Sequence, residues 1–331
     1  MFTQKRRFIK FSLLNLFLFP FIKFSLKATD LKNTKVLTNL IFFEHIISPD
    51  HPERPARIKY ILNNLKKSKN SDLLEIIDTN RDSQKWIREI HSENHINSLK
   101  KFHTLAEKVS RYAVKVCLTG VDKIIKKESK NIFCAVRPPG HHALNTGKDE
   151  GFCYYNHVAI TAKYIQKKYK LKKILIVDWD YHHGNSTEHF FYNDPSVLFF
   201  STHDQFAYPG TGSPKRQGNG EGFGFNINVH LPCKTKDEQI IKVFNQILIP
   251  KVHKFKPDFI LISAGFDSRK NDTLGCFDLS DDCFRKLTKI IKNLSERYCE
   301  NRILSILEGG YNLDGNAKAS ITHIDELNNL N

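Results

Sequence analysis

Cysteine pairing motifs are missing from this chain. Its seven cysteines are odd in number, and no two of them form a Cys-x-x-Cys pair. This pattern argues against a disulfide framework and against a zinc site built from cysteines. We therefore expect most of them to be core residues: Cys117, Cys134, Cys153, Cys233, Cys276, Cys283 and Cys299.

The chain also lacks an internal repeat and a long linker rich in Pro, Gly and Ser. Its 331 residues, 40% of them hydrophobic, are enough to bury a large core. Apolar stretches alternate with amphipathic ones along most of its length. We expect residues 29–331 to form a single α/β domain.

Acidic residues are absent from the first 28 positions, which carry six basic residues. Lys5, Arg6 and Arg7 precede an apolar run at 11–22, a layout typical of a bacterial export signal. That run is too short for an ordinary membrane-spanning helix. We expect residues 1–28 to direct export to the periplasm, leaving no integral membrane span after leader removal. The alternative is an extension on a cytoplasmic protein.

The formal net charge of +16 is high, but six of those charges lie in that first segment, which leaves +10 for the rest. The remaining lysines are scattered over stretches of helical pattern such as 164–173. Scattered lysines usually form solvated helix surfaces, so we expect no specific nucleic-acid partner.

Short apolar segments bounded by polar residues recur along the chain and predict strands, with helical patterns between them. This recurrence favours a mostly parallel sheet covered on both faces. The expected strands are 36–43, 131–136, 174–178, 197–201, 225–231, 258–263 and 302–307, and the expected helices are 58–67, 84–102, 114–127, 157–169, 237–253 and 284–298.

Polar side chains suited to catalysis follow four of these strands. Open parallel sheets keep their sites at the carboxyl ends of the strands, so we expect these side chains to meet. They are His141 and His142, Asp180 and His182, Asp267, and Tyr311.

Together these residues indicate metal-assisted hydrolysis. Asp180, His182 and Asp267 would form a mixed carboxylate–imidazole site with room for water and substrate, as a catalytic zinc requires. The tandem histidines could transfer protons, and a tyrosine on a Gly-Gly loop could donate to a developing oxyanion. Singly, each residue also has a structural explanation as a helix cap or a packed core residue.

Seven motifs in order resemble the histone deacetylase and acetylpolyamine amidohydrolase family over about residues 34–315. This resemblance implies a three-layer α/β/α fold around a mostly parallel sheet of about eight strands, as in arginase-like proteins, and zinc-dependent amide hydrolysis. The motifs are HPERPAR (51–57), RPPGHH (137–142), GFCYYN (151–156), DWDYHHGN (178–185), YPGTG (208–212), GFDS (265–268) and EGGYN (308–312).

The resemblance also implies roles at the reacting centre. It makes Asp180, His182 and Asp267 the zinc ligands, His141 and His142 the catalytic dyad, and Tyr311 the oxyanion donor. Asp178 would orient the first histidine and, with Ser201, bind a structural potassium. Asn185 stands where first-class deacetylases have an aspartate, so the second histidine should be less strongly held as imidazolium, as in the second-class branch.

The same resemblance implies a narrow tunnel for an extended acyl-amine. Phe152 and Tyr208 would wall it, with Gly151 and Gly310 beside them, and Arg57 would line a channel for the acetate product. Leu274 stands at a gatekeeper position and is apolar, which favours Nε-acyl-lysine over an acetylated polyamine. The polyamine remains the alternative substrate.

Two other function classes fit less well. A binuclear arginase-like enzyme would need aspartates where Gly184 and Arg269 stand. A binder that senses acylated ligands without turnover would not need the complete set of ligands, dyad and tyrosine. The acidic residue that grips the substrate backbone in the family has no clear counterpart here, and Glu107 is the candidate substitute. The sequence leaves the oligomeric state open.

Overall fold

The computed structural model describes residues 34–329. The expected export signal at 1–28 lies outside the described residues, and the division into a leader and one domain stays a prediction. Among the described residues, no helix is long and apolar enough to cross a membrane.

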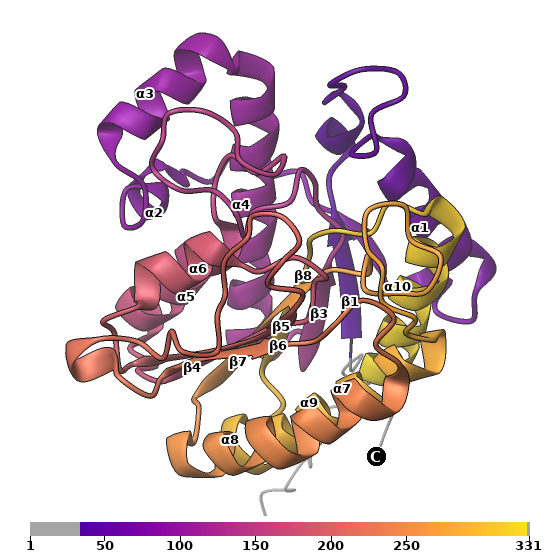
Figure 1. The fold of residues 1–331 in the computed structure, drawn as a ribbon. Coiled ribbons are helices and arrows are strands. Elements are labelled where there is room, and N and C mark those ends of the chain that lie inside the picture. The colour runs from indigo at the N-terminus through magenta and orange to yellow at the C-terminus, as the bar shows by residue number, and fades with distance from the viewer. Residues whose placement is uncertain (1–33, 330–331) are drawn as a thin grey trace, which may run out of the picture. The chain divides into compact units, whose positions relative to one another are not determined.

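An eight-stranded, all-parallel sheet forms the centre of the molecule (Figure 1). The strand order is β2-β1-β3-β8-β7-β4-β5-β6. Their bounds are β1 Thr34–Thr38, β2 Leu74–Ile76, β3 Asn131–Cys134, β4 Ile174–Asp178, β5 Val197–His203, β6 Asn226–His230, β7 Phe259–Ala264 and β8 Ile303–Leu307.

Helices cover both faces of the sheet (Figure 1). On one face pack α1 (Ala56–Lys67), α7 (Asp237–Val243), α8 (Ile249–Phe255), α9 (Asp281–Cys299) and α10 (Leu313–Asn328). On the other pack α3 (Glu93–Phe102), α4 (Thr104–Ile125), α5 (His157–Tyr169) and α6 (Asn185–Phe191). The short helix α2 (Gln84–Ile87) precedes α3, and a π-helical turn, Phe244–Leu248, joins α7 to α8.

Alternation along the strands divides the core between the two faces. In β4, Leu175 and Val177 join one apolar cluster, whereas Ile174 and Ile176 join the other. Successive strand residues point to opposite faces, so a strand buried on both sides must be apolar throughout. The three-layer arrangement expected from the resemblance is confirmed.

Two elements have different boundaries in the structure from those predicted from the sequence. The strand expected to run to Phe43 ends at Thr38, because the Asn39 side chain accepts a hydrogen bond from the Ile41 N–H (2.8 Å) and starts a 3-10 helix at Leu40–Phe43. The helix expected over 84–102 is split, because the Ser92 side chain caps a new helix through the His95 N–H (3.3 Å).

One cysteine pair departs from the expectation of core thiols. Cys233 and Cys276 form a disulfide across 43 positions, whereas the other five cysteines are free and buried. The odd count and the wide spacing gave no signal for it, because only the fold brings the loop after β6 beside the loop after β7.

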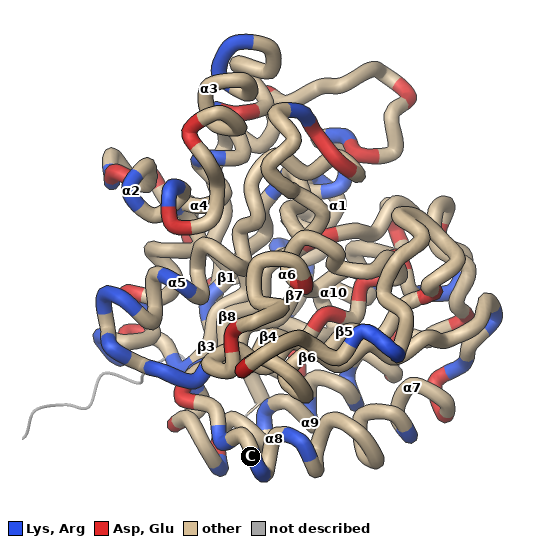
Figure 2. Tube along the Cα trace, turned by 60° about the vertical axis from the view of Figure 1, so that its left-hand side comes forward, with Lys and Arg blue, Asp and Glu red and all other residues tan. Residues whose placement is uncertain are grey.

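Basic and acidic residues are interspersed over the helices and loops (Figure 2). Many form ion pairs at the surface, such as Arg88 with Glu93 and Lys286 with Asp282. Such exposed pairs contribute little to stability.

Candidate metal and catalytic site

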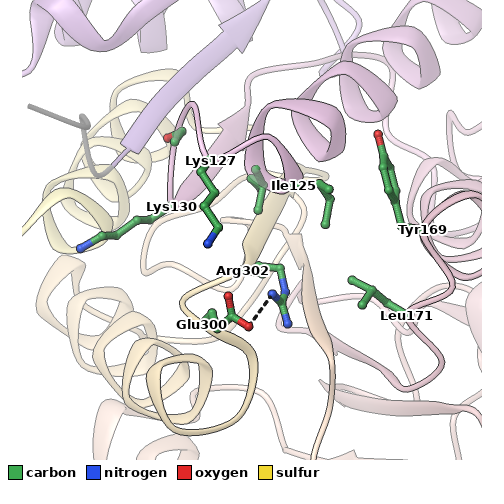
Figure 3. A pocket seen from close by; sticks show the side chains of 9 residues that line it. Ile125, Lys127, Lys130, Tyr169, Leu171, Glu300 and Arg302 are labelled. Carbon is green, nitrogen blue, oxygen red and sulfur yellow. Dashed lines mark ion pairs between the residues drawn. The ribbon is translucent and has the colours of Figure 1, made fainter. Parts of the chain in front are cut away.

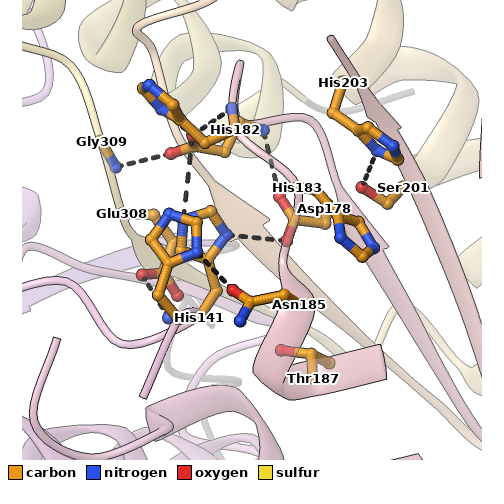
Figure 4. A network of polar contacts seen from close by, with 12 residues as sticks. His141, Asp178, His182, His183, Asn185, Thr187, Ser201, His203, Glu308 and Gly309 are labelled. Atoms are coloured by element: carbon orange, nitrogen blue, oxygen red, sulfur yellow. Dashed lines mark hydrogen bonds and ion pairs between the residues drawn. The ribbon is translucent and has the colours of Figure 1, made fainter. Parts of the chain in front are cut away.

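The four loops that carry the expected site residues leave four strands that are neighbours in the sheet. β3, β8, β7 and β4 lie side by side in that order. Their carboxyl ends therefore bring the tandem histidines, Tyr311, Asp267 and the Asp180–His182 pair to one edge. The arrangement around β4 and the dyad is drawn in Figure 4.

Asp180, His182 and Asp267 form the one potential metal-binding group found among the described residues. Their ligand atoms all lie within 4.8 Å of one another. His182 Nδ1 is 3.1 Å from Asp180 Oδ1 and 3.0 Å from Asp267 Oδ2. Two carboxylates and one imidazole converging on a point match the three protein ligands of a catalytic zinc.

Backbone groups orient the two carboxylates of this group. Asp180 Oδ2 accepts the Gly309 N–H (2.8 Å), and Asp267 Oδ1 accepts the Tyr181 N–H (2.8 Å). A Cβ on Gly265 would lie 1.9 Å from Asp180 Oδ2, so only bare backbone fits there. These contacts fix the ligand oxygens toward a common centre.

The electrostatics of the group favour a cation. Burial alone would lower the pKa of His182, yet hydrogen bonds with Asp180 and Asp267 raise it to about 10. Burial and the neighbouring Asp180 charge raise the pKa of Asp267 to about 7. Two buried carboxylates thus hold excess negative charge, and the donor set fits a divalent metal ion.

The two dyad histidines have different hydrogen-bond partners. His141 Nδ1 is 2.9 Å from Asp178 Oδ2, and His142 Nδ1 is 2.7 Å from Asn185 Oδ1. The two rings lie 4.1 Å apart between centroids. In each case the Nδ1 hydrogen is directed to an oxygen acceptor, which leaves Nε2 as the second functional atom.

The two imidazoles have opposite pKa shifts because their charged neighbours differ. Burial would lower the pKa of His141, but Asp178 and Asp180 raise it well above the usual value. Burial, together with the nearby His141 and His182, holds the pKa of His142 well below the usual value. His142 is therefore neutral and able to accept a proton, as a general base must be.

Tyr311 lies beside the tunnel residues and Arg57. Its ring is 6.0 Å from the Phe152 ring, and the Arg57 guanidinium lies 4.8 Å from its centroid. Burial raises the pKa of Tyr311 well above its usual value, so the hydroxyl keeps its proton and can donate it.

Residues that the resemblance assigns to the substrate tunnel lie around His142. The Tyr208 ring is 5.0 Å from the His142 ring, in an edge-on arrangement. A Cβ on Gly151 would lie 2.4 Å from His142 and 2.7 Å from Tyr208, so a glycine is required between them. Gly151 (φ 51°) and Phe152 (φ 69°) both adopt left-handed backbone, which turns the Phe152 ring toward Tyr311.

Arg57 is fully buried behind the tyrosine loop. Its side chain donates to the carbonyls of Gly310 (2.7 Å) and Glu308, and it pairs with Glu53 (3.3 Å). Arg137 also pairs with the Glu53 carboxylate. The guanidinium therefore holds the Gly310–Tyr311 backbone, and its role toward an acetate product stays a prediction.

Two polar residues of the site were missed by sequence reasoning. Glu308 accepts from the N–H groups of Gly140 (2.6 Å) and His141 (3.2 Å), which fixes the dyad loop. Asp272 accepts from the N–H groups of Tyr311 and Asn312. Glu308 directly follows the apolar strand β8, and that position is the signal that could have singled it out. Asp272 lies within the loop after β7 and had no such signal.

A pocket of about 350 Å³ lies away from this site (Figure 3). It is lined by Lys127, Lys130 and Arg302, next to the first residues of β3 and β8. Arg302 is engaged in an ion pair with Glu300 (3.2 Å). The pocket therefore opens at the amino edge of the sheet, opposite the metal ligands.

Comparison with known proteins decides the family. The histone deacetylase domain model matches residues 51–327. A probable deacetylase of Archaeoglobus fulgidus is 34% identical over 299 residues, covering 85% of this chain and 83% of that protein. The chain belongs to the histone deacetylase family.

Two further relatives agree. The chloroplastic histone deacetylase 14 of Arabidopsis thaliana is 34% identical, with 80% of this chain and 70% of that protein covered. The crystal structure of the HDA15 HD domain has a TM-score of 0.83 and 30% identity, covering 90% of this chain and 88% of that one. As a histone deacetylase family member, the protein is a deacetylase, a hydrolase of the arginase-like α/β fold.

Two residues expected to bind potassium are close to each other. Asp178 and Ser201 are register partners in the β4–β5 pair. Ser201 Oγ lies 2.8 Å from His203 Nδ1, and Asp178 Oδ2 is engaged by His141. The potassium itself stays a prediction from the family.

The rim of the site differs from the expectation at one position. Glu107 is buried in α4, where it accepts from Tyr155 (3.0 Å) and pairs with Arg111 (3.1 Å). It therefore does not reach a substrate, and the proposed substitution for the substrate-gripping acid is wrong on this geometry. Leu274 is 41% exposed, as a gatekeeper position requires.

The residues that argued against an arginase-like site have structural roles. A Cβ on Gly184 would lie 2.3 Å from Asp178 Oδ2, so no side chain fits at that position. Arg269 points to Asp281 instead, in an ion pair of 2.6 Å.

Proposed function

We propose that this protein is a zinc-dependent amidohydrolase that removes an acetyl or other acyl group from an amine, with Nε-acyl-lysine as the substrate class. The observation that carries the proposal is the meeting of three metal-ligand side chains, a histidine dyad and a buried tyrosine at one sheet edge. A zinc ion held by Asp180, His182 and Asp267 would polarise the acyl carbonyl and make the attacking water more acidic.

Each side chain near this metal site then has a separate role in proton transfer or charge stabilisation. His142 accepts the proton of the attacking water at Nε2, because its Nδ1 hydrogen is directed to Asn185. His141, held by Asp178, provides positive charge next to the reacting atoms. The Tyr311 hydroxyl donates a hydrogen bond to the oxyanion. As the C–N bond breaks, His142 returns the proton taken from water to the leaving amine, which completes the hydrolysis.

An acetylated polyamine is the second candidate substrate, and acidic residues near Tyr208 favour it. Burial raises the pKa of Tyr208 to about 12, and Cys153, Glu150 and Asp149 add to that rise. Glu150 is held by the Leu144 N–H (2.9 Å), and Asp149 is exposed. A carboxylate beside the tunnel mouth would suit a distant ammonium group on the substrate.

The test compares the two substrates with one enzyme preparation. The full chain, loaded with zinc, is assayed on an acetyl-lysine peptide and on an N-acetylated polyamine, and kcat/KM is measured for each. A higher value on the peptide supports the acyl-lysine proposal, and a higher value on the polyamine transfers it to the second candidate. Bound metal with no turnover of either would favour a non-catalytic binder.

We also propose that the protein is exported, with residues 1–28 as the leader. The Cys233–Cys276 disulfide supports this, because structural disulfides persist in oxidising compartments. Fractionation of the host and N-terminal sequencing test the proposal. A protein that keeps residue 1 and stays in the cytoplasm would contradict it.

A further inference from the structure

The loop after β7 and the loop after β8 are joined by one carboxylate, that of Asp272. Its Oδ1 accepts the N–H groups of Leu274 (2.9 Å) and Gly275 (3.3 Å). Its Oδ2 accepts the N–H groups of Tyr311 (2.7 Å) and Asn312 (2.9 Å). Hydrogen bonds to an ionised acceptor are the strong ones, so four of them fix both loops to a single side chain.

Two sets of hydrogen bonds fix the backbone around Tyr311: Asp272 accepts its N–H, and Arg57 Nε donates to the Gly310 carbonyl (2.7 Å). Among the described residues, the Tyr311 hydroxyl forms no hydrogen bond, and its ring is held by packing against Phe152 and the Arg57 guanidinium. Gly310, which precedes it, has φ 121° and has no side chain to anchor. The Tyr311 N–H bonded to Asp272 is therefore one of two backbone contacts that place its ring, and the Gly310 carbonyl bonded to Arg57 is the other.

We propose that Asp272 is a positioning residue for deacylation, which sets the Tyr311 hydroxyl over the reacting carbonyl and couples it to the gatekeeper Leu274. This inference rests on the proposed function of Tyr311. Asp272 forms no hydrogen bond to the three metal ligands, but its charge adds to the rise in the pKa of Asp267. Retention of the metal in the variant therefore separates an effect through the Tyr311 backbone from an electrostatic effect on the ligands. Misplacing a catalytic group by about 1 Å can cost about a hundredfold in rate.

A matched control is available at the other edge of the sheet. Asp258 Oδ2 accepts the N–H groups of Lys172 and Lys173, both at 2.8 Å, and is partly exposed as Asp272 is. Asp258→Ala removes a comparable carboxylate cap far from the carboxyl ends of the strands. It should lower Tm as Asp272→Ala does and leave kcat unchanged.

The test is a double-mutant cycle on the full, zinc-loaded chain, with the substrate that it turns over faster. We expect Asp272→Ala to lower kcat about 10- to 100-fold, with KM within about threefold of the unchanged protein and one metal ion still bound. Asp272→Ala combined with Tyr311→Phe should be no slower than Tyr311→Phe alone by more than about threefold, because the hydroxyl that Asp272 positions is already gone.

Three results would overturn the inference: an unchanged kcat in Asp272→Ala, loss of the metal, or losses that multiply in the double variant. If Asp272→Ala does not fold, Asp272→Asn replaces it, because the amide oxygen can still accept from one pair of N–H groups. We then expect a smaller loss of kcat than for Asp272→Ala. This loss should be absent when the same change is made in Tyr311→Phe. Full activity in Tyr311→Phe would instead refute the oxyanion role in the proposed function.

Discussion

At the scale of single residues, the hydrogen-bond partner of each dyad histidine decides what that histidine can do. Asp178 and Asn185 both accept from Nδ1, but one carries a charge and the other does not. Burial lowers the pKa of both rings, but the charges of Asp178 and Asp180 overcome it at His141 and raise its pKa. At His142 the Asn185 hydrogen bond is too weak to offset burial and the two neighbouring histidines, so its pKa stays lowered. Two adjacent, identical side chains thus differ in protonation at neutral pH.

Removal of either reacting group should reduce turnover without loss of metal. We expect His142→Ala and Tyr311→Phe each to lower kcat by about two to four orders of magnitude, because neither residue is a metal ligand. Steady-state kinetics and metal analysis of the purified variants measure both effects. Normal turnover in either one would refute the mechanism.

Most residues of the site could be predicted because they lie in sequence motifs with a defined spacing. Asp180 and His182 follow a buried strand directly, and the sequence places them at its end without knowledge of the fold. Asp272 was not predictable in the same way, because its partner Tyr311 is 39 positions away and the contact is made to backbone N–H groups. Every residue except proline carries a backbone N–H donor, so such a contact leaves no signal in residue type.

At the scale of elements, helix caps and turns set the ends of helices and strands that the hydrophobic pattern alone did not predict. Residues 84–102 have a helical pattern throughout, but Ser92 begins a new helix there. The edge strand β2, Leu74–Ile76, is three residues long and only partly buried, so no apolar run predicted it. The long central strands were predicted because they are buried on both faces.

The disulfide fixes the loop after β7 to the loop after β6. Its closure of 43 positions should contribute about 2–4 kcal/mol to the free energy of unfolding, chiefly by restricting the unfolded chain. We expect Cys233→Ser to lower that free energy by this amount, measured by denaturant unfolding under non-reducing conditions. Reductant should lower the stability of the unchanged protein and have no effect on Cys233→Ser. Equal stability of the two proteins would contradict a formed bond.

At the scale of the whole molecule, burial of both sheet faces places polar residues in the core, where a hydrogen-bond partner offsets the cost of leaving water. His323 in α10 is one example, packed between Trp179 and Phe133. Its Nδ1 donates to Thr288 Oγ1 (2.6 Å), whose own hydrogen goes to the Phe284 carbonyl, and its Nε2 accepts from Ser305 Oγ (2.9 Å). Both ring nitrogens of the neutral imidazole therefore have a hydrogen-bond partner.

This burial makes stability depend on pH in a defined direction. Burial lowers the pKa of His323 to about 3, so the folded state keeps the ring neutral while the unfolded state gains a proton below about 6.5. Its contribution is present above pH 6.5 and is lost as the pH falls, by about 1.4 kcal/mol per pH unit. Between pH 6 and 4.5, we expect His323→Gln to remove that slope, as measured by urea unfolding. The exposed His189→Gln serves as the control, and an equal slope in all three proteins would contradict the account.

The architecture as a whole was predictable because parallel strands need covering helices, and the alternation of the two is visible in the sequence. The pairing of strands was not, since the order β3-β8-β7-β4 brings together segments more than a hundred residues apart. That order is what makes one site from four loops. The family resemblance implied the number of strands and the site residues, but not the order of the strands.

The most direct test of metal-dependent deacylation is turnover of an acetylated amine by the full chain before and after chelation. One metal ion per chain is expected, with activity lost on chelation, restored by zinc, and absent in Asp180→Ala, which should no longer hold the ion. Turnover that survives removal of the metal would contradict the account.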